Sequence, residues 1–203
     1  EKIITDGKYY VDKTALIYHM THTYNYVFLS RPRRFGKSLL CSTLASYFRG
    51  EKELFQGLAM ERLEKEWKQY PVIHLSLASV KSDDPSGIKD LIDDKLELIE
   101  DGFGIPPKTG DLGRRLNNII LGCHKKYGER VVIIIDEYDA PLLNVLHEPE
   151  KLKIVRQIMR TLFSPLKDCD PYLRFLFITG ITKFSQLSIF SEINNLKPIS
   201  MLP

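Results

Sequence analysis

Residues 26–40 read YVFLSRPRRFGKSLL, and this stretch decides the fold. Its first residues are apolar and predict a short β-strand, its middle is a basic loop that ends in Gly-Lys-Ser, and its last residues begin a helix. A strand, a tight loop and a helix in this order are the layout of a phosphate-binding loop, or P-loop. The chain is therefore predicted to be an α/β protein built around a phosphate site.

The residue types in the loop suit the binding of nucleotide phosphates and a metal ion. Gly36 has no Cβ, so its backbone can curve against a phosphate and turn its N–H groups inward. The ammonium of Lys37 would bind the β- and γ-phosphates, and the hydroxyl of Ser38 would bind Mg²⁺. The helix that opens at Leu39 would add free N–H groups and the positive end of its dipole. The loop therefore predicts ATP and Mg²⁺ as ligands.

One position of the loop departs from the Walker A pattern G-x-x-x-x-G-K-[ST]. That pattern has glycine five residues before Gly36, where this chain has Arg31 followed by Pro32. Because proline fixes its φ angle, the loop is expected to leave its strand by a different path. The Gly-Lys-Ser tripeptide alone recurs by chance, so the prediction also needs a partner motif downstream.

The partner motif is a second apolar strand that ends in two carboxylates. Residues 131–135 are five consecutive β-branched residues, which is typical of a central strand of a parallel sheet buried on both faces. Asp136 and Glu137 follow as in the Walker B design, in which the first acid holds Mg²⁺ through water and the second orients or deprotonates the attacking water. The alternative, acids that simply mark the exit of a buried strand to solvent, is disfavoured by the Gly-Lys-Ser loop upstream.

Apolar strands alternate with helices along the chain. Further strands are predicted at 70–77, as an edge or near-edge strand, at 172–180 and, in short form, at 196–201. Helices are predicted at 13–22, 39–48, 51–69, 88–101, 112–127 and 150–166. Right-handed crossovers then require a doubly wound, mainly parallel sheet of about five strands, with the ligand at their carboxyl ends. Strand 172–180, if it lies between the P-loop strand and the Asp136 strand, gives the arrangement of P-loop NTPases with an additional central strand, as in AAA-like proteins.

Polar residues downstream complete the predicted site. Thr179 and Thr182 stand at the carboxyl end of strand 172–180, where an ATPase senses the γ-phosphate. Asp139 would assist the metal or, as the favoured interpretation, cap the next helix. Arg33 and Arg34 would add charge to the γ-phosphate or face solvent, and the sequence favours neither. The predicted nucleotide contacts are Arg33, Arg34, Phe35, Gly36, Lys37, Ser38, Leu39, Thr179 and Thr182, with Lys37 and Glu137 as catalytic residues and Ser38 and Asp136 at the metal.

Composition indicates one ordinary globular domain. The chain has 203 residues, of which 43% are hydrophobic and 27% charged, so residues 1–203 are predicted to form a single domain with segment 1–24 packed on the core. The net charge of +3, from 29 basic and 26 acidic side chains, gives no case for nucleic-acid or membrane binding by the domain as a whole. No apolar run approaches the roughly 18 residues of a membrane span.

The cysteines and histidines suggest no metal site. Cys41, Cys123 and Cys169 are odd in number and widely spaced, without a C-x-x-C pair, so neither a disulfide framework nor a zinc site is predicted. The reducing cytoplasm is the predicted location. His74, inside strand 70–77, is interpreted as a histidine whose hydrogen bonds are satisfied in the core or at the sheet edge.

Four segments together resemble the bacterial AAA-ATPase-like proteins: YYVDKT at 9–14, FLSRPRRFGKS at 28–38, IDEYDAPL at 135–142 and TGITKF at 179–184. The R-P-R-R-F-G-K-[ST] loop is specific to this family, which carries arginine where the Walker A pattern has its first glycine. The resemblance implies a P-loop nucleotide-binding domain, usually followed by a C-terminal domain similar to PD-(D/E)xK nucleases. The chain is therefore expected to be part of a longer protein whose effector domain is missing here and through which nucleic acid would be bound.

These observations predict a domain that binds ATP with Mg²⁺ and hydrolyses ATP to regulate or power an attached effector. The alternative is a nucleotide-binding switch or scaffold without hydrolysis, but such a protein has no use for Glu137 at its position. A small-molecule kinase would need a basic lid, and the only candidate, 101–110, has one lysine and no arginine. The sequence leaves the oligomeric state open.

Overall fold

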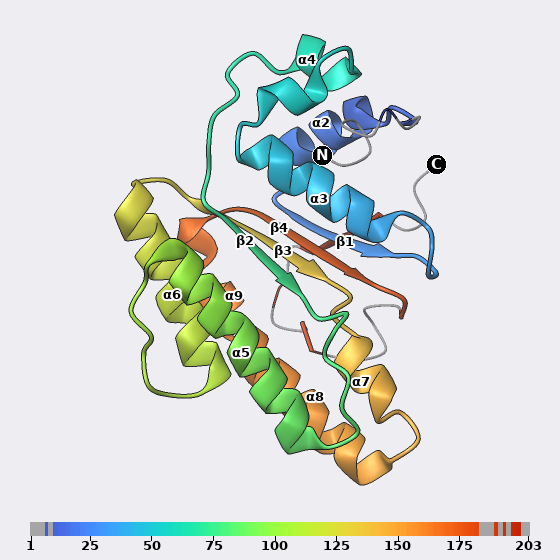
Figure 1. The fold of residues 1–203 in the computed structure, drawn as a ribbon, viewed down its shortest axis with the longest axis vertical. Helices are drawn as coiled ribbons and strands as arrows, with labels where there is room; N and C mark the ends of the chain where they lie inside the picture. Colours follow the sequence, from blue (N-terminus) through green and yellow to red (C-terminus); the bar gives the residue numbers. More distant parts are fainter. Residues whose placement is uncertain (1–6, 8–9, 183–188, 191–192, 194–195, 200–203) are drawn as a thin grey trace.

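The computed structural model describes residue 7, residues 10–182, residues 189, 190 and 193, and residues 196–199. Five parallel strands form one sheet in the order β2-β3-β4-β1-β5, with helices on both faces (Figure 1). The strands are β1 (Tyr26–Ser30), β2 (Val72–Ser76), β3 (Val131–Asp136), β4 (Leu173–Gly180) and β5 (Lys197–Pro198). The predicted α/β class and the parallel five-stranded sheet are confirmed.

The order of the strands brings the predicted motifs together at the carboxyl ends of the strands. Strand β4 lies between β1 and β3, which is the additional central strand predicted from the sequence. Its residues pair with both neighbours: Thr179 lies beside Leu29 of β1, and Ile178 beside Ile135 of β3. Because all the strands are parallel, the P-loop after β1 and the acidic pair after β3 lie on either side of the end of β4.

Two layers of helices cover the sheet (Figure 1). One face carries α2 (Thr14–Thr23), α3 (Lys37–Phe48) and α4 (Ala59–Leu63), and the other carries α5 (Pro85–Phe103), α6 (Leu112–Tyr127), α7 (Ala140–Asn144), α8 (Pro149–Phe163) and α9 (Pro165–Asp168). Strand β3 is buried along its whole length, as its β-branched run predicted. In the described part of the chain, no helix is both long and apolar enough to cross a membrane.

Alternation along the strands separates two hydrophobic cores. Val27 and Leu29 belong to the core on the α3 face, whereas Tyr26 and Phe28 belong to the core on the opposite face, where the ring of Phe28 packs on that of Tyr138. The α3 core also contains Cys41, which is fully buried. Helix α3 is therefore held against the sheet directly behind the P-loop that precedes it.

Capping residues set the ends of α6 as predicted and the start of α5 earlier than predicted. The side chain of Asp111 accepts a hydrogen bond from the Arg114 N–H at 2.8 Å and caps α6, and Gly128 ends that helix with φ 68°. Helix α5 begins three residues earlier than predicted, at Pro85, because Asp84 caps it through the N–H of Gly87.

The predicted helix at 51–69 is wrong over most of its length. The structure has a 3-10 turn at Lys52–Phe55 and the short α4, separated by Gly57 with φ 76°. A tertiary contact sets the start of α4: Asp12 accepts a hydrogen bond from the Ala59 N–H at 2.7 Å. The same Asp12 carboxylate accepts the Thr14 N–H at 2.8 Å, which ties the beginning of α2 to α4. The apolar residues of 51–69 thus pack as a folded-back segment instead of along one helix face.

Candidate nucleotide-binding site

The P-loop leaves β1 through a backbone bond to the neighbouring strand. The Arg31 N–H donates to the Gly180 carbonyl at 3.2 Å, which extends the pairing of β1 and β4 past the last strand residue. The loop then turns through two residues with positive φ, Arg34 at 67° and Gly36 at 77°. Gly36 occupies the N-cap position of α3, where its missing Cβ permits the left-handed conformation. The free N–H groups of the first turn of α3 therefore face the loop.

The side chain of Lys37 folds back into the loop. It is only 4% exposed, and its Nζ donates hydrogen bonds of 3.0 Å to the carbonyls of Arg31 and Pro32. Arg31 is the residue at which the loop departs from the Walker A pattern, and Pro32 follows it. Their two carbonyls hold the ammonium but supply no negative charge to balance it.

The remaining predicted contacts of the loop are at the surface. Phe35 is 68% exposed and Leu39 is 41% exposed. Arg33, Arg34 and Ser38 are exposed as well. The loop therefore presents two guanidinium groups and the Ser38 hydroxyl around a buried ammonium.

Thr179 organises the acidic end of β3. Its Oγ1 donates to Oδ1 of Asp136 at 2.6 Å and accepts the N–H of Glu137 at 3.3 Å. Thr179 is fully buried and Asp136 is 3% exposed. This position favours a role for Thr179 in orienting Asp136. The sequence predicted a different role for Thr179, direct contact with the γ-phosphate.

Glu137 occupies a strained backbone position. Its φ is 54°, a conformation that costs a residue other than glycine about 1–3 kcal/mol. The chain turns here because the N–H of Tyr138 donates to the Thr179 carbonyl at 2.9 Å. The half-buried Glu137 therefore stands at a sharp turn directly after the Asp136 carboxylate.

The favoured prediction for Asp139, a helix cap, is wrong for its side chain. The residue stands at the N-cap position of α7 but makes no capping bond. Its Oδ2 accepts the N–H groups of Ile181 and Thr182 at 2.9 and 2.7 Å and the Thr182 hydroxyl at 2.7 Å. Asp139 thus holds the turn after β4. The Thr182 hydroxyl, a predicted sensor, also lies 3.1 Å from the hydroxyl of Tyr138.

Replacing Gly180 by alanine is expected to destabilise the protein by about 1–3 kcal/mol. A Cβ at this position would lie 2.6 Å from Cδ1 of Tyr138 and 2.8 Å from Oδ1 of Asp139, and both neighbours are buried. Gly102→Ala is the control, because its Cβ would meet no atom within 4 Å and alanine favours helix α5 by about 1 kcal/mol. Urea unfolding should show opposite shifts for the two variants, and a Gly180→Ala midpoint equal to that of the wild type would contradict the packing argument.

Replacing Thr179 by valine is expected to cost about 1–3 kcal/mol of stability, since it leaves buried oxygen and N–H groups without a partner. Valine keeps the shape of the side chain. Thr179→Ser keeps the hydroxyl and loses only a methyl group, so it should cost about 1 kcal/mol or less. Guanidinium unfolding measures the stability of both variants. A Thr179→Val variant as stable as the wild type would show that the hydroxyl does not hold Asp136.

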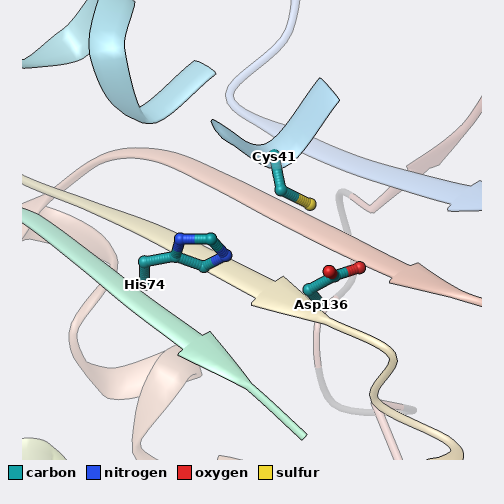
Figure 2. A group of neighbouring side chains, drawn as sticks. All are labelled: Cys41, His74 and Asp136. Carbon is teal, nitrogen blue, oxygen red and sulfur yellow. The ribbon is translucent and has the colours of Figure 1, made fainter. Parts of the chain in front are cut away.

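Sequence reasoning missed two neighbours of Asp136. Cys41 of α3 and His74 of β2 approach it from the same face of the sheet (Figure 2). The Nε2 atom of His74 is buried and has no hydrogen-bond partner in the described part of the chain, so the interpretation of a satisfied histidine is wrong for this atom. No local signal could find this cluster, because its three members are 33 or more residues apart in the sequence.

The candidate kinase lid lies at the wrong end of the sheet. Residues 104–111 connect α5 to α6, and the Phe103 ring at the end of α5 packs on the ring of Tyr127 with centroids 6.0 Å apart. Tyr127 ends the helix that leads into β3, so the connector starts beside the amino ends of the strands, away from the P-loop (Figure 1). This placement does not support the kinase alternative.

The parallel sheet with a central β4, the Gly-Lys-Ser loop between β1 and α3, and the acidic pair after β3 define the P-loop, AAA-like class of nucleotide-binding folds. The chain belongs to the AAA-ATPase-like family, since the family model described as predicted AAA-ATPase matches residues 1–190.

Comparison with curated proteins identifies a relative in Azotobacter chroococcum mcd 1, described as an uncharacterized protein in the vnfD 5' region. The two sequences are 38% identical over 196 residues. The match covers 97% of this chain but only 38% of that protein, so the chain spans less than two thirds of the relative's length. No solved structure matches the chain.

Proposed function

We propose that this domain binds ATP with Mg²⁺ and hydrolyses it, and so regulates or powers an effector attached to it. One observation carries the proposal: two opposite charges are buried at the carboxyl ends of the strands, and neither is in an ion pair in the described part of the chain. Among the described residues, neither Lys37 nor Asp136 forms an ion pair, although both are at least 96% buried. A buried charge without a counter-charge is costly, so a ligand that brings both a phosphate and a cation would relieve both.

The charges lie close enough to serve one ligand. Cys41, one turn into α3, has a pKa raised by burial and by the nearby Asp136 carboxylate and lowered by the charge of Lys37. Both charged groups therefore lie near the same thiol. Mg²⁺·ATP would bring both an anionic phosphate group for Lys37 and a cation for Asp136.

Each predicted residue has a part in this proposal. The N–H groups from Arg34 to Leu39 and the Lys37 ammonium would hold the phosphates, and Arg33 and Arg34 would add positive charge at the surface. Ser38 and Asp136 would hold Mg²⁺, which would neutralise phosphate charge. Glu137 would orient the attacking water and accept its proton.

The alternative proposal is a nucleotide-dependent switch or scaffold without hydrolysis. The bonds of Lys37 to the carbonyls of Arg31 and Pro32 favour this alternative, because a phosphate must displace them before it can contact the ammonium. Binding would then be weak, and loop rearrangement would be the signal.

The partner of the domain is also a proposal. Because the chain corresponds to 38% of the length of its relative, the effector would be a further domain of a longer protein. The resemblance to AAA-ATPase-like proteins favours a nuclease-like domain, through which nucleic acid would be bound. A cytoplasmic location is proposed with it.

Calorimetric titration of ATP and of a non-hydrolysable analogue in the presence of Mg²⁺, followed by a phosphate-release assay, tests the proposal. We expect one binding site that depends on Mg²⁺, and phosphate release from ATP alone. Binding without phosphate release would favour the switch. Absence of binding by the wild-type protein would contradict both functions.

A further inference from the structure

A second cluster of metal-binding groups lies beside Asp136. The thiol of Cys41, a ring nitrogen of His74 and a carboxylate oxygen of Asp136 lie within 4.8 Å of one another. Figure 2 shows the three side chains gathered in the space between α3 and the sheet, one from α3, one from β2 and one from the end of β3. The cluster is on the inner side of α3, whereas the loop residues proposed to meet the nucleotide are at its exposed N-terminus.

The three groups are a donor set for a softer ion than Mg²⁺. Zinc is bound by thiolate, imidazole and carboxylate, whereas Mg²⁺ and Ca²⁺ prefer oxygen alone. The Nε2 atom of His74 is buried with no hydrogen-bond partner in the described part of the chain, and Cys41 is fully buried against Asp136 and Thr179. A buried lone pair without a donor is costly, and a metal ion would satisfy it.

We propose that Cys41, His74 and Asp136 bind one Zn²⁺ ion, with a fourth position open to water or to an incoming ligand. The thiol would lose its proton to solvent as the S–Zn bond forms. The resulting thiolate and the Asp136 carboxylate would neutralise the charge of the ion, and His74 would bind as a neutral imidazole. The site would then enclose no net charge in a buried place.

The geometry requires only a small contraction. Two ligand atoms on a tetrahedral zinc ion are about 3.5 Å apart, given bonds of about 2.0–2.3 Å. The 4.8 Å limit on the present separations is therefore about 1 Å larger, a difference that side-chain rotation can close. Thr179 would support the site from outside, because its hydroxyl already orients the Asp136 carboxylate.

We expect the ion to enter from the surface beside His74. His74 lines a depression of about 630 Å³ beside the edge strand β2, together with Arg49, Tyr70 and residues of α5. Strand β2 has no neighbour on its outer side among the described strands, so this edge is not covered by the sheet. Zinc would reach His74 first and then Cys41 and Asp136.

The site would compete with the proposed nucleotide function, and this part of the inference rests on that function. Asp136 would bind Mg²⁺ in one state and Zn²⁺ in the other. Zinc would therefore inhibit Mg²⁺·ATP binding by occupying Asp136, without binding to the P-loop.

Titration of the nucleotide-free protein with Zn²⁺, against a chromophoric chelator, tests the site directly. We expect one tight site that is weakened at least about tenfold in Cys41→Ser and in His74→Asn. Cys123→Ser is the matched control, since Cys123 is also fully buried and free but lies in α6. Co²⁺ added in place of Zn²⁺ should give a thiolate-to-cobalt absorption band in wild type and Cys123→Ser, and no such band in Cys41→Ser.

Several outcomes would overturn the inference. They are a wild type without tight Zn²⁺ binding, a cobalt band that survives in Cys41→Ser, or an affinity that His74→Asn leaves unchanged. Far-UV circular dichroism would check that the variants are folded. His74 is on an edge strand and only partly buried, so its variant can decide the question even where Cys41→Ser unfolds.

A competition experiment separates this inference from the proposed function. Zinc should raise the apparent dissociation constant of the Mg²⁺-bound ATP analogue in wild type, and much less in His74→Asn, whose own nucleotide binding should be unchanged. Zinc binding without competition would overturn the shared use of Asp136 alone. If the protein binds no nucleotide, the proposed function fails, and the titration with zinc alone still decides the metal site.

Discussion

Lys37→Ala is expected to abolish ATP binding, with a loss of affinity of at least about 100-fold. The substitution removes the buried ammonium that we propose to bind the β- and γ-phosphates. In the structure the same ammonium donates to the carbonyls of Arg31 and Pro32. The variant therefore also loses two bonds within the loop, but a phosphate must displace these bonds to reach the ammonium, so the expected loss of affinity comes from the missing ammonium. Calorimetric titration with Mg²⁺ and a non-hydrolysable analogue measures the loss.

The control for this variant is Lys125→Ala. Lys125 is an exposed residue in the last turn of α6, so its replacement makes the same change of net charge away from the P-loop. We expect its nucleotide affinity to equal that of the wild type. A Lys37→Ala variant that binds the analogue as tightly as Lys125→Ala would show that the P-loop is not the nucleotide site.

Glu137→Gln is expected to keep ATP binding and to reduce hydrolysis by about 10²–10⁴-fold. Glutamine has nearly the same size and the same backbone requirements, so the turn with φ 54° and its bonds to Thr179 should persist. The amide cannot accept the proton of the attacking water, and only the chemical step should suffer. Phosphate release, measured at saturating ATP beside a calorimetric titration, separates the two effects.

Glu150→Gln, an exposed acid in the first turn of α8, is the control with unchanged turnover. Normal phosphate release by Glu137→Gln would disprove the assignment of Glu137 as the water-activating residue. If the wild type binds ATP and releases no phosphate, Glu137→Gln has nothing to lose, and the switch without hydrolysis becomes the better description.

The elements that carry their own local signal could be predicted from the sequence. The β-branched run before Asp136 forms the fully buried β3. The capping residues Asp111 and Gly128 mark the two ends of α6 as expected. The stretch 51–69 could not be predicted in the same way. Its composition favours a helix, but the bond from Asp12 and the left-handed Gly57 break it into a turn and a short helix. Contacts with a distant segment outweigh a weak helical preference.

For the candidate site, the sequence predicted which segments come together better than it predicted the hydrogen bonds that their side chains make. The Gly-Lys-Ser loop and the acidic pair were found from the pattern alone, because each requires particular residue types at fixed spacing. Which acceptor Lys37 uses, and that Asp139 holds the turn after β4 instead of capping α7, could not be read from the pattern. A polar side chain has several possible partners of similar energy, and the fold decides which one is in reach.

By itself the sequence determined most of the strands and helices, that the sheet is parallel, and that the Gly-Lys-Ser loop and the acidic pair lie at the carboxyl ends of its strands. These follow from backbone preferences and apolar runs, which depend on residues next to one another. Only the tertiary structure decided that Thr179 bonds to Asp136 and that Cys41 and His74 gather beside that carboxylate. Such groupings join residues far apart in the chain, and they exist only because the pairing of β4 with β3 and the packing of α3 on the sheet bring their side chains within bonding distance.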